Sequence, residues 1–146
     1  MIGEIVCGSC SWFGGPHDEG VSPSEALAWW ETWEQVVRDH AEGLFLDEPP
    51  PNTTGLARRL DPDEFYIAMR WDYDEISKAD LVRTICLVRS PETSLAFWAR
   101  PSDWGPHEDT GRVCDISPGL MEALGVDTDW ELEIVVIPPK RETEVA

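Results

Sequence analysis

Positive charge is scarce in this 146-residue sequence. It has 11 Lys and Arg residues against 29 Asp and Glu residues, which gives a formal net charge of −18. Such a surface repels polyanions, and no basic stripe with interleaved aromatic residues offsets it. We therefore expect neither nucleic acid nor an anionic membrane as a partner. A neutral or weakly charged ligand or a basic protein patch fits better, although solubility alone also explains the charge.

Long apolar runs and a secretion signal are absent as well. No stretch approaches the roughly 18 apolar residues of a membrane span. The opening MIGEIVCGSC lacks the basic and apolar regions of a signal peptide. These absences predict a protein that is cytoplasmic as synthesised. A role outside the cell would need another export route or a place in a phage particle.

Cysteine is also sparse, and the four cysteines leave three alternatives open: buried free thiols, a disulfide, or a metal site. Cys7 and Cys10 form a CxxC pair, while Cys86 and Cys114 lie in separate apolar runs. Four cysteines allow disulfides or a zinc tetrad. Because free Cys in an apolar run is commonly a small buried hydrophobe, buried thiols are favoured. We predict no metal and no cofactor.

The length and a hydrophobic content of 42% suit one globular domain with a core. We predict this domain over residues 1–137, followed by a flexible tail over residues 138–146. Apolar alternation and turn residues predict six short strands. They lie at residues 2–10, 65–71, 81–89, 94–100, 113–116 and 130–137. Residues 72–79 read as a polar turn.

Two helices are expected among these strands. Ser117 and Pro118 begin a short helix over residues 118–124, and Gly125 ends it. A longer amphipathic helix over about 22–42 is predicted inside an insertion over residues 20–51. Its start has a capping box, and its apolar residues recur at three- and four-residue spacing. Its tryptophans, Trp29, Trp30 and Trp33, are expected in the core, with a sugar-binding cleft as the alternative.

The order of these elements predicts a mainly β fold, a small closed six-stranded barrel. Four segments carry a resemblance to a known family: CSWFG at 10–14, TGLARRLDP at 54–62, FYIAMRW at 65–71, and the long run at 94–126 that contains RPSDWGPHEDTGRVCDISPG. The chain resembles the double-psi β-barrel of rare lipoprotein A, expansins and related glycan-active proteins. The resemblance covers most of the chain outside residues 20–51.

This resemblance implies a chemistry. In rare lipoprotein A, an Asp before a Gly-Pro turn and an earlier His cleave peptidoglycan glycan strands by a lytic transglycosylase route. Asp103 takes the place of that Asp, whereas the His position falls on Ala57 or Arg58, so the His is missing.

The residues themselves favour Asp103 as a general acid. Glycosidic cleavage needs a carboxylic acid whose pKa is raised by apolar surroundings. Asp103 lies between Pro101 and Trp104. A lytic route needs only one such acid because a hydroxyl of the sugar is the nucleophile, whereas hydrolysis normally needs a second carboxylate. Asp115 is the obvious second group.

Each candidate also has a structural reading. The alternative for Asp103 is a turn-initiating residue, and the alternative for Asp115 is a cap or brace for the helix start or a partner of Arg112. His107 is a candidate base or orienting group for Asp103, or an exposed loop residue. His17 and Asp18 are substitutes that the sequence leaves unranked.

The aromatic residues divide into two predicted sets. We expect Trp12, Phe13 and Trp104 at an open groove, where they stack on sugar rings, with Arg112 as a further substrate contact. Trp71 and Trp98 lie in strands and are expected in the core. The predicted function is a glycan-directed cell-wall protein that binds peptidoglycan or another polysaccharide and cleaves it. The alternative is a non-catalytic glycan-binding or structural barrel module with a protein assembly partner, for example in a phage virion.

Overall fold

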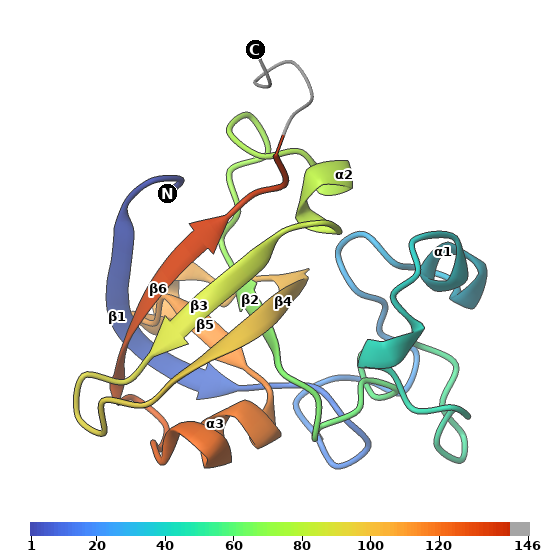
Figure 1. The fold of residues 1–146 in the computed structure, drawn as a ribbon. Coiled ribbons are helices and arrows are strands. Elements are labelled where there is room, and N and C mark those ends of the chain that lie inside the picture. Colours follow the sequence, from blue (N-terminus) through green and yellow to red (C-terminus); the bar gives the residue numbers. More distant parts are fainter. Residues whose placement is uncertain (141–146) are drawn as a thin grey trace.

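Six strands close into a barrel in the computed structural model, which describes residues 1–140 (Figure 1). The barrel order is β1-β5-β2-β4-β3-β6, in which β1 pairs with β5 and β2 with β4 in parallel and the other pairs are antiparallel. The strands are β1 Ile5–Trp12, β2 Tyr66–Met69, β3 Ile85–Arg89, β4 Ala96–Trp104, β5 Cys114–Ile116 and β6 Glu131–Ile137. The predicted mainly β class and closed six-stranded barrel are confirmed.

Alternation along the strands fills the barrel. In β6, Leu132, Ile134 and Val136 are buried, while the residues between them face outward. This period of two is what pleated strands impose, since successive side chains point to opposite faces. β4 runs on to Trp104 rather than ending at Arg100, so Asp103 lies in a strand and not in a turn.

The cysteines follow the same alternation. Cys10, Cys86 and Cys114 are buried, Cys7 is exposed, and all four are free, so the disulfide alternative is wrong. Burial raises the pKa of the Cys10 thiol to about 11, which keeps it protonated at neutral pH. Within residues 1–140, no group of three or more His, Cys, Asp or Glu residues is placed to hold a metal ion.

The short helices agree with the sequence only in part. α3, Pro118–Leu124, is confirmed: the Ser117 side chain accepts from the amide of Leu120, and Gly125 ends the helix at a φ of 71°. α2, Lys78–Leu81, lies where a turn and the start of a strand were predicted. That prediction is wrong because Ser77 caps a helical turn that buries Leu81.

Residues 13–65, here called the β1–β2 connection, contain little regular structure. The helix predicted over 22–42 is wrong: only α1, Trp33–Arg38, and a 3-10 turn, Glu42–Leu44, form. The carbonyl of Pro23 instead accepts from the amides of residues 54 and 55, and that of Glu25 accepts from Ala57. These bonds to a distant segment use the groups that a helix would need. The capping box lies at Thr32 and Gln35 instead.

Tryptophans hold the connection together. Trp29 and Trp30 are buried, and Trp30 packs edge-on against Trp29 and Phe45. The expectation of core tryptophans is therefore confirmed, although they form a cluster and not a helical stripe. Trp71 is buried as predicted, whereas Trp98 is 51% exposed on the outside of β4, so its assignment to the core is wrong.

Figure 1 shows the connection beside the barrel, with α1 at its far edge and α3 across one end of the barrel. One cluster of buried hydrophobic residues includes residues from both regions. No helix within residues 1–140 is long and apolar enough to cross a membrane. Residues 138–140 follow β6 without strand or helix, and the rest of the predicted tail, 141–146, lies outside the described residues.

Candidate functional site

Two carboxylates lie in one row on the outside of the barrel. Ala68 of β2 is the register partner of Asp103 on β4 and of Asp115 on β5. Ser11 of β1 continues the row beyond Asp115. Directly opposed residues share a face of the sheet, and neighbouring strands lie about 4.8 Å apart, so the two Asp backbones are separated by roughly 10 Å across Ala68. This row is the candidate site.

A bulge in β4 brings Asp103 to this face. Arg100 pairs with Tyr66 and Pro101 with Ile67, but Asp103 and not Ser102 pairs with Ala68. Residues three apart in a regular strand point to opposite faces, whereas one extra residue restores the same face. Arg100 and Asp103 therefore share the outer face.

The carboxylate of Asp103 is held asymmetrically. Its Oδ1 accepts from the backbone amides of Ala28 and Trp104, both at 2.9 Å. Its Oδ2 has no hydrogen-bond partner among the described residues and is not one of the buried atoms without a partner, so a part of its surface meets solvent. Burial raises the pKa of Asp103 to about 6, the two amides oppose this rise, and the charge of Glu25 adds to it.

Two tryptophans fix the backbone at Asp103. The indole of Trp71 donates to the Asp103 carbonyl at 2.8 Å, and the indole of Trp104 donates to the Trp71 carbonyl at 3.1 Å. Trp71 is thus a positioning residue that the sequence indicated only as core. Ala28 acts through its backbone amide, for which no residue pattern is a signal.

Asp115 neither caps α3 nor forms an ion pair with Arg112. Ser117 caps α3, and Arg112 pairs with Asp129 at 2.8 Å. Burial raises the pKa of Asp115 to about 6; nearby Arg112 lowers it, and the charges of Asp103 and Asp18 raise it further. Asp115 is therefore a second carboxylate that titrates near neutral pH.

Asp18 is a structural acid. It is buried, and its two carboxylate oxygens accept from the amides of Gly14 at 2.7 Å and Gly20 at 2.9 Å. These bonds brace the turn that follows β1. Its charge still reaches Asp115.

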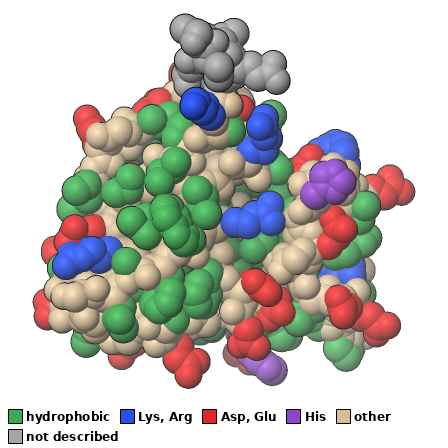
Figure 2. Space-filling model, viewed as in Figure 1, with side chains coloured by type: hydrophobic (Ala, Val, Ile, Leu, Met, Phe, Trp, Pro, Cys, Tyr) green, Lys and Arg blue, Asp and Glu red, His purple; other side chains and the backbone are tan. Residues whose placement is uncertain are grey.

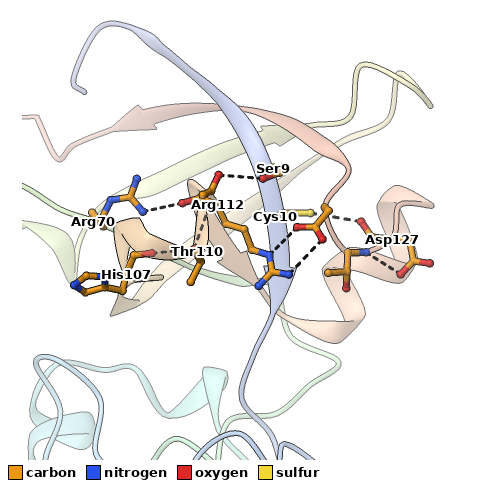
Figure 3. Close-up of polar contacts among 10 residues, drawn as sticks. Ser9, Cys10, Arg70, His107, Thr110, Arg112 and Asp127 are labelled. Carbon is orange, nitrogen blue, oxygen red and sulfur yellow. Dashed lines mark hydrogen bonds and ion pairs between the residues drawn. The ribbon is translucent and has the colours of Figure 1, made fainter.

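His107 is engaged in its own turn. Its Nδ1 accepts from the amide of Asp109 at 3.2 Å, and the ring is largely exposed. Arg70 holds the surrounding loop by donating to the carbonyls of Pro106 at 2.8 Å and Arg112 at 2.7 Å, and Figure 3 shows the second of these bonds. Among the described residues, no hydrogen bond or ion pair joins His107 to Asp103.

Only one of the three predicted groove aromatics lies beside Asp103. Trp104 follows it directly and is 41% exposed. Phe13 is buried edge-on against Tyr66 at 5.0 Å, so its predicted place at an open groove is wrong. Trp12 is exposed but lines a separate cleft of about 390 Å³ that also contains His17 and Met121.

No protein-family model matches the chain, and no curated protein is significantly similar to it. An accessible carboxyl group with a pKa near 6 can donate a proton at neutral pH, and a second carboxylate on the same face can stabilise positive charge or direct water.

Proposed function

We propose that this protein acts on cell-wall glycan and cleaves peptidoglycan strands as a lytic transglycosylase, with Asp103 as the general acid. The asymmetric environment of Asp103 carries the proposal, because two amides hold one oxygen while the other is free to present a proton. The resemblance of its surroundings to the double-psi β-barrel of rare lipoprotein A supports the same substrate class.

The proposed reaction needs only this acid. Protonated Oδ2 gives its proton to the glycosidic oxygen, and the bond from that oxygen to the anomeric carbon breaks. A hydroxyl of the same sugar then forms a new bond to the anomeric carbon. Its proton passes to the Asp103 carboxylate, which restores the acid and leaves an anhydro end on the product.

Asp115 takes a supporting part in this proposal. In its ionised form it lies across Ala68 from Asp103 and stabilises positive charge that develops on the sugar ring. If Asp115 directed water instead, the product would carry a reducing end. The product end therefore distinguishes the two routes.

The experiment is to incubate purified protein with intact peptidoglycan and with strands stripped of stem peptides, and to identify product ends by mass spectrometry. We expect anhydro-ended fragments, and a loss of release of about 100-fold or more in Asp103→Asn. Asp74→Asn, which removes an exposed charge elsewhere, is the matched control. Equal release by wild type and Asp103→Asn would refute the assignment.

A second candidate, an assembly module without catalysis, has one observation in its favour. Four apolar residues on neighbouring strands lie next to one another in register around the barrel: Ile5, Val135, Leu87 and Trp98. They form a row on the outside of the barrel that is apolar, whereas the row of Asp103 and Asp115 is charged. Figure 2 shows hydrophobic side chains gathered over β3, β4 and β6. Exposed apolar patches mark interaction sites.

The same assay separates this candidate from the enzyme. Glycan binding without release, unaffected by Asp103→Asn and lost in Trp104→Ala, would favour a glycan-binding module. Absence of both binding and release would leave a structural role, which Trp98→Ser should impair if the apolar row is the contact.

A further inference from the structure

A cleft of about 890 Å³ separates the β1–β2 connection from α2 and β4. It contains four of the chain's 11 Lys and Arg residues, Arg38, Lys78, Arg83 and Arg100, against two acids, Glu31 and Asp39. In Figure 2, basic side chains surround the hollow between the barrel and the connection. Such a local excess of positive charge in a chain of net charge −18 favours an anionic ligand in this cleft.

Two of these cations, Arg100 and Arg83, have no ion-pair or aromatic partner among the described residues, whereas the Lys78 ammonium lies 5.2 Å from the ring centre of Tyr73. Arg38 pairs with Asp39, but Arg100, Arg83 and Lys78 have no carboxylate partner among the described residues. Arg100 is half-buried, and within residues 1–140 its guanidinium donates only to the carbonyl of Val82, at 3.5 Å. Its desolvation is therefore poorly compensated within the chain.

A buried donor adds to this picture. Trp29 lines the same cleft, and its indole N–H is one of two buried side-chain polar atoms without a partner in residues 1–140. Buried polar groups without partners are uncommon in folded proteins. This N–H is itself buried, so Arg100 and not Trp29 presents the free donors to the cleft.

The cleft adjoins the candidate site. Ala28 lines the cleft and donates its amide to Asp103. Arg100 lies on the same face of β4 as Asp103 because of the bulge between them. A polysaccharide bound at Asp103 would therefore extend beside this cleft.

We propose that the cleft binds a carboxylate group of the glycan on which Asp103 acts, with Arg100 as the main contact and Arg83 and Lys78 as supporting charges. The substrate class is then an acidic polysaccharide. This inference rests on the proposed function and adds the substrate's charge to it.

Carboxylate chemistry fits the cleft better than the alternatives. A guanidinium binds a carboxylate through two parallel hydrogen bonds. A dianionic phosphate would meet Glu31 and Asp39 within the same lining. The net charge of the whole chain disfavours polyanions in general. At physiological salt this repulsion is screened beyond about 8 Å, so the local excess of cations in the cleft outweighs it there.

The test measures binding and not only cleavage. Calorimetric titrations would use five probes: glycan strands with stem peptides, strands stripped of them, polygalacturonate, neutral chitin oligosaccharides, and inorganic phosphate. We expect the carboxylate-bearing probes to bind more tightly than the neutral one, with a preference that falls at high salt. The order among the first three identifies stem-peptide, lactyl or uronic carboxylates as the source.

The variants isolate the contact. Arg100→Gln should weaken binding of the preferred acidic probe about tenfold or more and leave the neutral probe unchanged. Arg89→Gln is the matched control, since Arg89 pairs with Glu133, does not line the cleft, and gives the same change in net charge. If Arg100→Gln loses its fold by circular dichroism, the double variant Lys78→Gln and Arg83→Gln decides, because both side chains are exposed.

Three results would overturn the inference. If the cleft variants bind acidic glycan as tightly as the wild type does, while Asp103→Asn loses cleavage, the proposed role of the cleft is refuted and the proposed function is not. Tighter binding of inorganic phosphate than of any carboxylate probe also refutes the proposed role of the cleft. Failure of the wild type to bind or cleave any glycan removes both proposals.

Discussion

The barrel and the β1–β2 connection are stabilised in different ways. Barrel strands pair through regular ladders between alternating sequences, with Leu132 and Ile134 as typical interior residues. The connection is held by backbone bonds between distant segments, such as Pro23 with Thr54 and Leu46 with Arg59, and by its tryptophan cluster. Periodic patterns describe the first region and not the second.

The difference matters for the site because Asp103 belongs to both regions. The barrel supplies its strand position, while the connection supplies the amide of Ala28 and part of the burial that raises its pKa. Chemistry at Asp103 therefore depends on the less regular region. The variants below test how far the two regions are independent.

The largest effect is expected from Trp30→Ala. Trp30 is fully buried, packs against Trp29 and Phe45, and donates to Asp39 at 3.0 Å. Its truncation should cost about 3–5 kcal/mol. Hydrogen exchange should show loss of protection across the connection first, with the barrel strands still protected. Simultaneous loss in both regions would mean that they form one cooperative unit.

Gly55→Ala is expected to be next. A Cβ at Gly55 would overlap the backbone of Ser24 and Glu25, so the segments must separate, at a cost of about 1–3 kcal/mol. The amide of Ala28 should then exchange faster. Gly43→Ala is the control, since a Cβ there meets nothing within 4 Å. Equal denaturation midpoints for both variants would contradict the close approach.

Stability should also depend on pH through Asp103. Its pKa is about 6 in the fold against an ordinary 3.8, so the folded state binds the proton more tightly and stability falls as pH rises from about 4 to 6. Asp103→Asn should be more stable than wild type at pH 7 by about 1–2 kcal/mol, a value reduced because Oδ2 meets solvent. The difference should vanish below pH 4, whereas Asp74→Asn should show no such pattern in urea titrations.

The smallest effects come from two helix caps, one in each region. Ser117→Ala and Thr32→Ala each remove a capping oxygen and should each cost about 1 kcal/mol. Ser117 lies between α3 and β2, so its loss should lower the midpoint of global unfolding. Loss of the Thr32 cap should raise exchange within the connection alone. A global effect of Thr32→Ala would argue against separate stability.

The barrel strands and α3 could be predicted from the sequence because their signals are local. Alternation, turn residues and the Ser117 and Gly125 caps act locally, so the strands and α3 could be predicted from short windows. The helix over 22–42 could not be rejected in this way. Its capping signals and apolar spacing were genuine, but bonds from residues 54–57 outweighed them.

For the candidate site too, local signals were predictable from the sequence and contacts between distant residues were not. Residue types and their order were enough to single out Asp103, Asp115 and Trp104 and to predict a closed barrel around them. Only the folded chain decided that a bulge turns Asp103 and Arg100 to one face, that Ala28 donates to Asp103, that Phe13 is buried, and that Arg112 pairs with Asp129. These outcomes depend on which distant backbone and side-chain groups meet, and burial by those groups sets the pKa of Asp103.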